Sequence, residues 1–401
     1  MMDLTDEQRA LRQAVSALLA RPQRRGPRDR SDGSDGSDRS DAGDRSDVSD
    51  QDDEGDRGDE GVWRRLCAEV GVTGLAIPER YGGAGAGPVE THVVAEELGR
   101  RLLPAPLLGS AVLAAQTILA TGDGAACERL LPAIADGTAI AALAWTTEAG
   151  HWDPAEVAFR AVPAGPGAAG DGWVLDGTAH YVLHGDRADV LLVAARTPDG
   201  IGLFEVDPRT AGVRRTAVTS MDPASRLAVV ELAGAAGRRI GGCGHAALAR
   251  ARDLACIALS AEQVGAAQRA LDLTVSYTTT RVQFGRAIGG FQALQHRMAD
   301  LHVLVESARS LSYGTAAAAA AGASYDSAPD LGLRAAAAKV YCSEALARVA
   351  AEMIQLHGAI GITWEYDAHR FLKRAHSTAQ LFGQPAEHLA RVASMLIEPQ
   401  S

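Results

Sequence analysis

The sequence predicts a mainly helical α+β protein in three parts: an N-terminal helical domain, a middle antiparallel β domain and a C-terminal four-helix bundle. Two observations predict this order. Apolar residues recur at helical spacing in the first and last thirds, and short β-type runs broken by Gly, Pro and Asp fill the middle. The 401 residues are enough for two or three domains. We place the domains at 1–137, 138–236 and 237–401.

The N-terminal part begins with a helix signal. Thr5-Asp6-Glu7-Gln8 fits a capping box, in which the Thr5 side chain accepts from the backbone N–H of Gln8. Leu11, Val15 and Leu18 follow at helical spacing. Further helical patterns run through residues 63–70, 93–98 and 111–119. The first part is therefore predicted to be helical.

An acidic insertion interrupts this part. Residues 29–60 hold 14 acidic residues and 4 arginines, so they carry −10 of the net charge of −11. Asp recurs at every third position, whereas the ligands of a calcium-binding EF-hand alternate with period two. With few apolar residues to offset the entropy of ordering, residues 24–60 are predicted to be a disordered insertion. The rest of the chain is nearly neutral, which argues against a basic nucleic-acid-binding surface.

The middle part has the pattern of a sheet or small barrel. Runs such as Val190-Leu191-Leu192-Val193 are separated by the turn signals Asp171-Gly172, Asp176-Gly177 and Asp199-Gly200. No helical pattern lies between the runs, so a doubly wound nucleotide-binding fold is excluded.

The last part shows three long apolar stripes and one shorter one, typical of a helix bundle. They consist of Ile257, Ala261, Val264, Leu271 and Val275; of Leu294, Met298, Leu301 and Val305; of Cys342, Leu346, Val349, Met353 and Leu356; and of Leu389, Val392 and Leu396.

The cysteines and the hydropathy pattern give expectations about compartment. Five scattered cysteines without a C-x-x-C pair argue against a disulfide framework and a zinc site, so we expect no metal. The acidic N-terminus lacks a signal-peptide pattern, and no apolar run is long enough to span a bilayer. We therefore expect a cytoplasmic protein.

Two segments of the last part stand out as candidate binding sites. Residues 281–296 place an arginine, an aromatic and carboxamides around a turn between helices, and residues 355–362 end a helix with small residues. Together they suit a phosphate and a flat ring system. The alternative is a basic loop and a helix C-cap, and the residues alone do not decide between the two. The Walker glycine loop, H-E-x-x-H and G-x-S-x-G are absent.

Outside the acidic insertion, the chain resembles the acyl-CoA dehydrogenase family. The resemblance rests on the order and spacing of several motifs. These are Leu4-Thr5-Asp6-Glu7-Gln8, Ile77-Pro78-Glu79-Arg80-Tyr81-Gly82-Gly83, Glu96-Glu97-Leu98-Gly99-Arg100, residues 172–177, Arg281-x-Gln-Phe-Gly-Arg-x-Ile and Gln355-x-x-Gly. The resemblance implies a flavoprotein with the three-part fold described above.

The resemblance also implies where FAD would bind. On the β side, the segment Trp145-Thr146-Thr147-Glu148 and the aromatic Tyr181 would contact the flavin, although Leu183 and His184 replace a polar pair common in the family. The dinucleotide would be bound by the far segments, in part from a neighbouring subunit. The expected residues there are Arg281, Gln283, Phe284, Gln292, Gln355, Gly358 and Ala359.

The family reaction implied by the resemblance removes the α-proton of an acyl thioester such as acyl-CoA with a carboxylate. The β-hydrogen leaves as hydride to the flavin, and an electron-transfer flavoprotein reoxidises it. The expected assembly is a homodimer, a homotetramer or a heterotetramer with a homologous subunit.

The carboxylate that serves as catalytic base in the family that the chain resembles is missing from its usual positions. Alignment through Leu381-Phe382-Gly383 puts Gly383 at the usual position, and Ala255 occupies the alternative position on the first bundle helix. Glu262, two helical turns beyond Ala255 on the same face, is the candidate base. Gly383 retains a backbone N–H that suits the thioester carbonyl.

Three hypotheses follow. The first is an FAD-dependent acyl-CoA dehydrogenase. The second is a partner subunit that lacks the base, in a heteromeric acyl-CoA dehydrogenase. The third is a flavin monooxygenase on the same fold, which needs no α-proton base. Fold alone does not choose among them.

Overall fold

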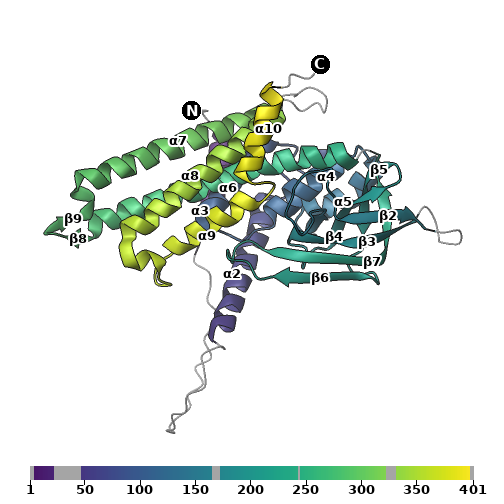
Figure 1. Cartoon of the computed structure of the whole chain (residues 1–401), viewed down its shortest axis with the longest axis horizontal. Helices are drawn as coiled ribbons and strands as arrows, with labels where there is room; N and C mark the ends of the chain where they lie inside the picture. The colour runs from purple at the N-terminus through teal and green to yellow at the C-terminus, as the bar shows by residue number, and fades with distance from the viewer. Residues whose placement is uncertain (1–3, 22–46, 165–171, 243, 322–330, 398–401) are drawn as a thin grey trace, which may run out of the picture.

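The computed structural model describes residues 4–21, 47–164, 172–242, 244–321 and 331–397. Helices come first, a sheet follows and long helices end the chain, as predicted (Figure 1). The N-terminal helices are α1 (Asp6–Ala20), α2 (Asp47–Val70), η1 (Glu79–Tyr81), α3 (Pro88–Arg101), η2 (Leu107–Ala114), α4 (Ala115–Ala120) and α5 (Gly124–Ala135).

The predicted capping box at the first helix is confirmed. The Thr5 side chain accepts from the Gln8 N–H at 3.2 Å, and the Gln8 side chain accepts from the Thr5 N–H at 3.1 Å. Val15 and Leu18 are buried against the next helices.

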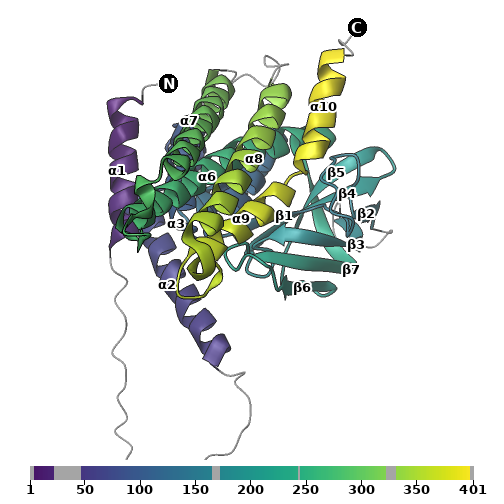
Figure 2. The same cartoon turned by 60° about the vertical axis from the view of Figure 1, so that its left-hand side comes forward.

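The acidic insertion is shorter than predicted. Helix α2 begins at Asp47, so residues 47–60 are helical and the prediction of disorder is wrong there. The second half of α2 is anchored in the core by three buried side chains, Val62, Trp63 and Leu66. Because a helix that is already formed is extended at far lower free-energy cost than a new one is started, the polar residues before them can continue the helix. Figure 2 shows the first turns of α2 projecting from the body of the protein. Residues 24–46 of the predicted insertion lie outside the described residues.

The sheet contains β1 (Ala141–Ala144), β2 (Phe159–Pro163), β3 (Gly172–Leu183), β4 (Val190–Thr197), β5 (Gly200–Val206), β6 (Val213–Val218) and β7 (Leu227–Ile240). Its order is β1-β4-β2-β3-β7-β5, with β6 paired to β7. Most pairs are antiparallel as predicted, but β4 runs parallel to β1 and β2. Strand β7 continues to Ile240, four residues past the boundary expected at 236.

The C-terminal part contains α6 (Gly244–Thr280), the hairpin β8 (Val282–Gln283) and β9 (Arg286–Ala287), η3 (Ile288–Gly290), α7 (Gln292–Ala321), α8 (Leu331–His357), η4 (Gly358–Ile362), α9 (Ala368–Gln380) and α10 (Pro385–Ile397). Helices α6, α7 and α8 pack on one another, and α9 and α10 pack on α8.

The predicted stripe of α8 is confirmed, since Cys342, Leu346, Val349, Met353 and Leu356 are all buried. The prediction that the apolar stripe of α10 packs in the bundle is wrong. Leu389 and Leu396 are 51% and 65% exposed, and the buried residue of α10 is instead His388. The fourth side of the bundle is therefore made by two short helices. The connection between them, residues 381–384, lies where the bundle meets the sheet (Figure 1).

Candidate functional site

A first cavity lies between strand β3, the segment before β7 and helix α9. It has a volume of about 690 Å³, and we name it the Tyr181 cavity. Its lining consists of Ala149, Gly150, Trp152, Tyr181, Ser220, Met221, Leu227, His376, Ser377, Gln380, Leu381 and Gln384.

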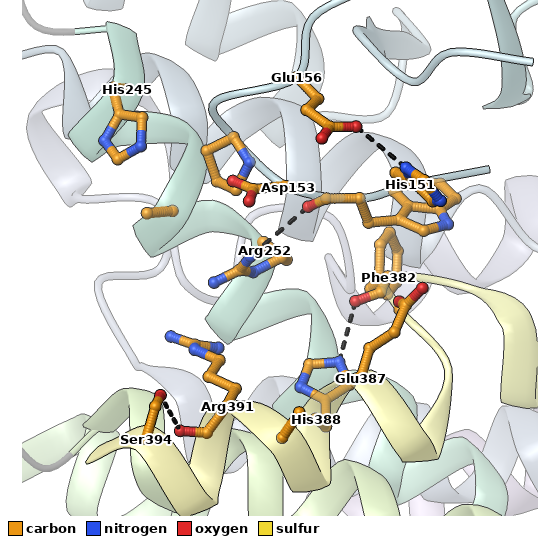
Figure 3. Close-up of a pocket in the computed structure, with 15 residues that line it drawn as sticks. His151, Asp153, Glu156, His245, Arg252, Phe382, Glu387, His388, Arg391 and Ser394 are labelled. Carbon is orange, nitrogen blue, oxygen red and sulfur yellow. Dashed lines mark hydrogen bonds and ion pairs between the residues drawn. The ribbon is translucent and has the colours of Figure 1, made fainter. Parts of the chain in front are cut away.

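A second cavity, named the Gly383 cavity, has a volume of about 620 Å³ and lies between the β1–β2 connection, the first half of α6 and helix α10 (Figure 3). Its lining consists of His151, Trp152, Asp153, Pro154, Glu156, His245, Ala249, Arg252, Phe382, Gly383, Glu387, His388, Ala390, Arg391 and Ser394.

The two cavities share a wall. Trp152 lines both of them, while Leu381 and Gln384 face the Tyr181 cavity and Phe382 and Gly383 face the other. The Trp152 and Phe382 rings meet edge to face with centroids 5.0 Å apart. Groups bound on either side of this wall would be near neighbours.

Three aromatic residues have left-handed backbone conformations, which bulky side chains rarely adopt. Tyr181 (φ 58°) lies at an irregularity in the β3–β7 pairing, Phe382 (φ 61°) lies in the shared wall, and Phe284 (φ 53°) lies at the tip of the β8–β9 hairpin. Such strain is concentrated at functional sites, where the surrounding structure maintains it. All three residues fall in segments identified from the sequence as candidate sites.

Two features of the structure favour glycine at position 383. Its φ of 110° is one that side-chain-bearing residues avoid, and a Cβ there would lie 2.9 Å from His388 Nε2. Among the described residues, the N–H of this buried glycine has no backbone or side-chain acceptor. Since buried N–H groups are nearly always paired, this donor is suited to an oxygen of a bound ligand.

The charged groups of the Gly383 cavity are mostly paired. Arg391 binds both Asp253 oxygens, at 2.6 and 2.9 Å. Burial lowers the pKa of His388 to about 4, so at neutral pH its ring is uncharged and Nε2 donates to the Phe382 carbonyl at 3.0 Å. This hydrogen bond fixes the backbone beside Gly383 (Figure 3).

Glu262 lines neither cavity. Its carboxylate lies 3.6 Å from Arg374 Nη1, and Arg374 Nε lies 2.7 Å from Asp222. Burial raises the pKa of Glu262 to about 7, an effect that Arg374 opposes and Asp222 reinforces. The predicted base therefore belongs to an ion-pair network between α6, α9 and the segment before β7.

The predicted β-side residues lie in different environments. Tyr181 lines the first cavity and donates through its hydroxyl to the Glu148 carbonyl at 3.1 Å. Trp145 is fully buried, with its ring 5.1 Å from Trp152, so its side chain contributes to the core and not to a cavity. Thr147 is half-buried outside both linings.

The remaining predicted residues lie at the far end of the bundle, beside the hairpin and η4 (Figure 1). Tyr277 of α6 stacks on His357 of α8, which brings the two segments to the same end. All the predicted residues there are exposed: Arg281, Gln283, Phe284, Gln292, Gln355, Gly358 and Ala359. They line neither cavity.

The Tyr181 cavity fits the flavin that the resemblance implies. The Tyr181 ring forms one side, and Gly150 lies beside it with a φ of 76°, where an added Cβ would be in ordinary contact with the ring at 3.5 Å. The hydroxyl of Ser377 and the amide of Gln380 supply polar groups on α9. A cavity lined by an aromatic ring and a few polar groups suits a flat heteroaromatic ring.

Sequence reasoning missed Glu387, Arg252 and Arg391, all of which line the Gly383 cavity. They belong to no motif, and only the fold brings them to Gly383.

Within the described ranges, no group of three or more His, Cys, Asp or Glu side chains is arranged to hold a metal ion. No helix within those ranges is both long and apolar enough to cross a bilayer.

Comparisons with known proteins agree with this architecture. Residues 45–138 match the N-terminal domain of acyl-CoA dehydrogenase, and residues 244–397 match its C-terminal domain. Acyl-CoA dehydrogenase IpdE2 of Mycolicibacterium smegmatis is 39% identical over 331 residues, which cover 82% of this chain and 86% of that protein.

Two solved structures extend the likeness to the whole fold. A variant of the steroid ACAD Tcur3481–Tcur3483 is 30% identical, with a TM-score of 0.79 and 98% of each chain covered. The ChsE4–ChsE5 complex of Mycobacterium tuberculosis is 27% identical, with a TM-score of 0.80 and all of each chain covered. The chain belongs to the acyl-CoA dehydrogenase family, whose members are flavoprotein oxidoreductases.

Proposed function

We propose that this protein is an FAD-dependent dehydrogenase that converts an acyl-CoA or related acyl thioester to its 2,3-enoyl thioester and passes the electrons to an electron-transfer flavoprotein. The observation that carries the proposal is the pair of adjoining cavities. The flavin ring would occupy the Tyr181 cavity and the thioester the Gly383 cavity, on either side of Trp152 and residues 381–384.

The chain's own groups suit the first part of this chemistry. The bound flavin supplies a hydride acceptor for the β-hydrogen. The unpaired N–H of Gly383 would donate to the thioester carbonyl and stabilise the negative charge that develops on its oxygen. Trp152 and Phe382 would exclude water around that oxygen, which strengthens the interaction.

We further propose that a second copy of the chain completes the cofactor site. The candidate dinucleotide-binding residues are exposed at the far end of the bundle, and Phe284 is 90% exposed there. Apolar side chains this exposed favour an interface. In a two-fold assembly, the far end of one subunit would reach the cofactor of the other.

A base-lacking partner subunit of a heteromeric enzyme is the alternative. Two observations favour it: Gly383 carries no side chain, and two similar structures are named as pairs of different proteins. In that case this chain would bind the thioester but would remove no proton alone.

An anaerobic titration of the purified protein with acyl-CoA thioesters, following the flavin absorbance band, tests the proposal. Loss of the band with at least one thioester is the expected result. A spectral shift without bleaching would instead support the partner-subunit alternative. No change with any thioester would contradict both.

A further inference from the structure

We propose that Glu387 provides the carboxylate that removes the substrate α-proton, taking over from the missing side chain at Gly383. The inference rests on the proposed dehydrogenation and identifies the base for it. It assigns a catalytic role to a residue one helical turn away from the expected position, on the first turn of α10.

The two positions meet in space. Glu387 Oε2 lies 3.2 Å from the point where a Cβ of residue 383 would be. The Glu387 side chain thus begins on α10 but brings its carboxylate to the place from which a side chain at 383 would extend. Figure 3 shows this carboxylate directed into the cavity beside Phe382.

The glycine and the glutamate are complementary. A residue with a side chain at 383 would crowd both the Glu387 carboxylate and the His388 ring. Glycine relieves that crowding, and its own N–H has no acceptor among the described residues. The same residue thus supplies a polarising donor and leaves room for the carboxylate, the two groups that proton abstraction beside a carbonyl requires.

Glu387 is positioned but not engaged in an ion pair. Its Oε2 accepts from the Gln384 N–H at 3.0 Å, half of a capping box for α10. Its other oxygen has no partner within the described part of the chain. The side chain is exposed at the cavity, so a proton that it takes up can pass on to solvent.

The other carboxylates near the cavity have partners of their own, and none of them is among the three atoms that lie nearest to a Cβ at residue 383. Asp253 is held by both terminal nitrogens of Arg391, and Glu156 lies 3.0 Å from His151 Nδ1. Asp153 accepts from the Ala155 N–H at 2.9 Å and so fixes the turn after Trp152. Of these acids, only Glu387 adjoins Gly383.

The proposed step breaks the α C–H bond. The proton forms a new O–H bond on the Glu387 carboxylate, and the electron pair remains on the substrate as the enolate of the thioester, with charge on the carbonyl oxygen near the Gly383 N–H. Reversal of this step in D₂O returns a deuteron to the α-carbon. Isotope exchange therefore reports on the base without any transfer to the flavin.

The experiment compares wild type with Glu387→Gln, Glu387→Asp and Glu262→Gln, and with Glu344→Gln as a control on the exposed face of α8. Each purified protein is incubated anaerobically in D₂O with butyryl-CoA, octanoyl-CoA or 3-cyclohexylpropionyl-CoA, and α-deuteration is measured by mass spectrometry. Thioester binding is followed by the shift of the flavin spectrum. The Gln side chain keeps the acceptor for the Gln384 N–H but is no base.

The expected result is a loss of exchange of about 10²-fold or more in Glu387→Gln, because general bases contribute on that order. Binding should be retained, Glu387→Asp should keep partial exchange, and Glu344→Gln should match wild type. Wild-type exchange in Glu387→Gln, or loss only in Glu262→Gln, would overturn the assignment and leave the proposed function standing. A wild-type protein that neither binds nor exchanges any of the three thioesters would overturn both.

Discussion

The two ends of the bundle differ in how complete they are. Where the bundle meets the sheet, two cavities are lined by residues of the β1–β2 connection, β3, the segment before β7, α6, α9 and α10. At the far end, Phe284, Ile362 and Trp364 are 90%, 71% and 81% exposed. The first region is lined by residues of this one chain, whereas the proposed dinucleotide-binding residues at the far end line neither of the two cavities. On our proposal, the chain contributes half of each of two shared sites.

The largest expected effect on stability is at Arg374 of α9, where the bundle meets the sheet. Its guanidinium is buried between Asp222 and Glu262, so Arg374→Met would leave two buried carboxylates without their cation. Breaking a buried pair in this way costs about 3–5 kcal/mol. Urea unfolding should show this loss, whereas Arg370→Met, which removes an exposed pair with Asp367, should cost less than about 1 kcal/mol. An equal loss of unfolding free energy in the two variants would contradict a stabilising role for the Arg374 ion pairs.

Glu262→Gln should change how stability depends on pH. Because the folded-state pKa is raised to about 7 from an ordinary value of 4.5, the stabilisation by protonated Glu262 is full below about pH 4.5 and is lost as the pH rises to about 7. The glutamine variant should therefore gain stability relative to wild type between pH 5 and pH 8, by up to about 3 kcal/mol. Denaturant unfolding at the two pH values measures this difference. A constant offset would show that Glu262 does not titrate in this range.

Gly383→Ala should be more harmful than the same change at another glycine. At 383 the new Cβ would lie 2.9 Å from His388 Nε2, in addition to backbone strain. We expect a cost of about 1–3 kcal/mol, read as a lower melting temperature. Gly285→Ala is the control, since its φ is 78° but nothing lies within 4 Å of the added atom. Similar shifts for the two variants would mean that crowding at 383 is unimportant.

Phe284→Ser should affect the cofactor far more than the fold. The side chain is 90% exposed, so the free energy of unfolding of the subunit should change by less than about 0.5 kcal/mol. Flavin content, measured as the ratio of flavin to protein absorbance after purification, should fall. Val303→Ser, which alters an exposed apolar residue on α7, should retain its flavin. Equal flavin in both variants would argue against a cofactor role for the hairpin.

Regular patterns were enough to predict the architecture. Apolar spacing predicted α8 because its stripe faces neighbours along its whole length, and the Thr5 capping box is a purely local interaction. The stripe of α10 failed because periodicity shows that a helix is amphipathic and does not show what covers it. Likewise, composition predicted disorder for residues 47–60, where attachment to a buried helix decides the outcome.

The site was only partly predictable for a related reason. Tyr181 and Gly383 could be named as candidates because each lies in a recognisable segment, and both line a cavity. Glu387 has no local signal, since its relation to Gly383 depends on how the chain turns into α10. Trp145 lies in the expected segment, but its ring is turned into the core against Trp152. Motifs locate the segments, and packing decides which side chains reach the ligand.

Subunit complementation tests most directly whether the two ends form one site across copies. His376→Trp would fill the Tyr181 cavity from an exposed position, and Phe284→Ser would alter the far end. Purified alone, each variant should contain little flavin. Co-expressed with different tags and isolated as a mixed dimer, they should regain about half of the wild-type flavin, because one of the two sites then has both intact halves. A mixed dimer as colourless as its parents would contradict the shared site.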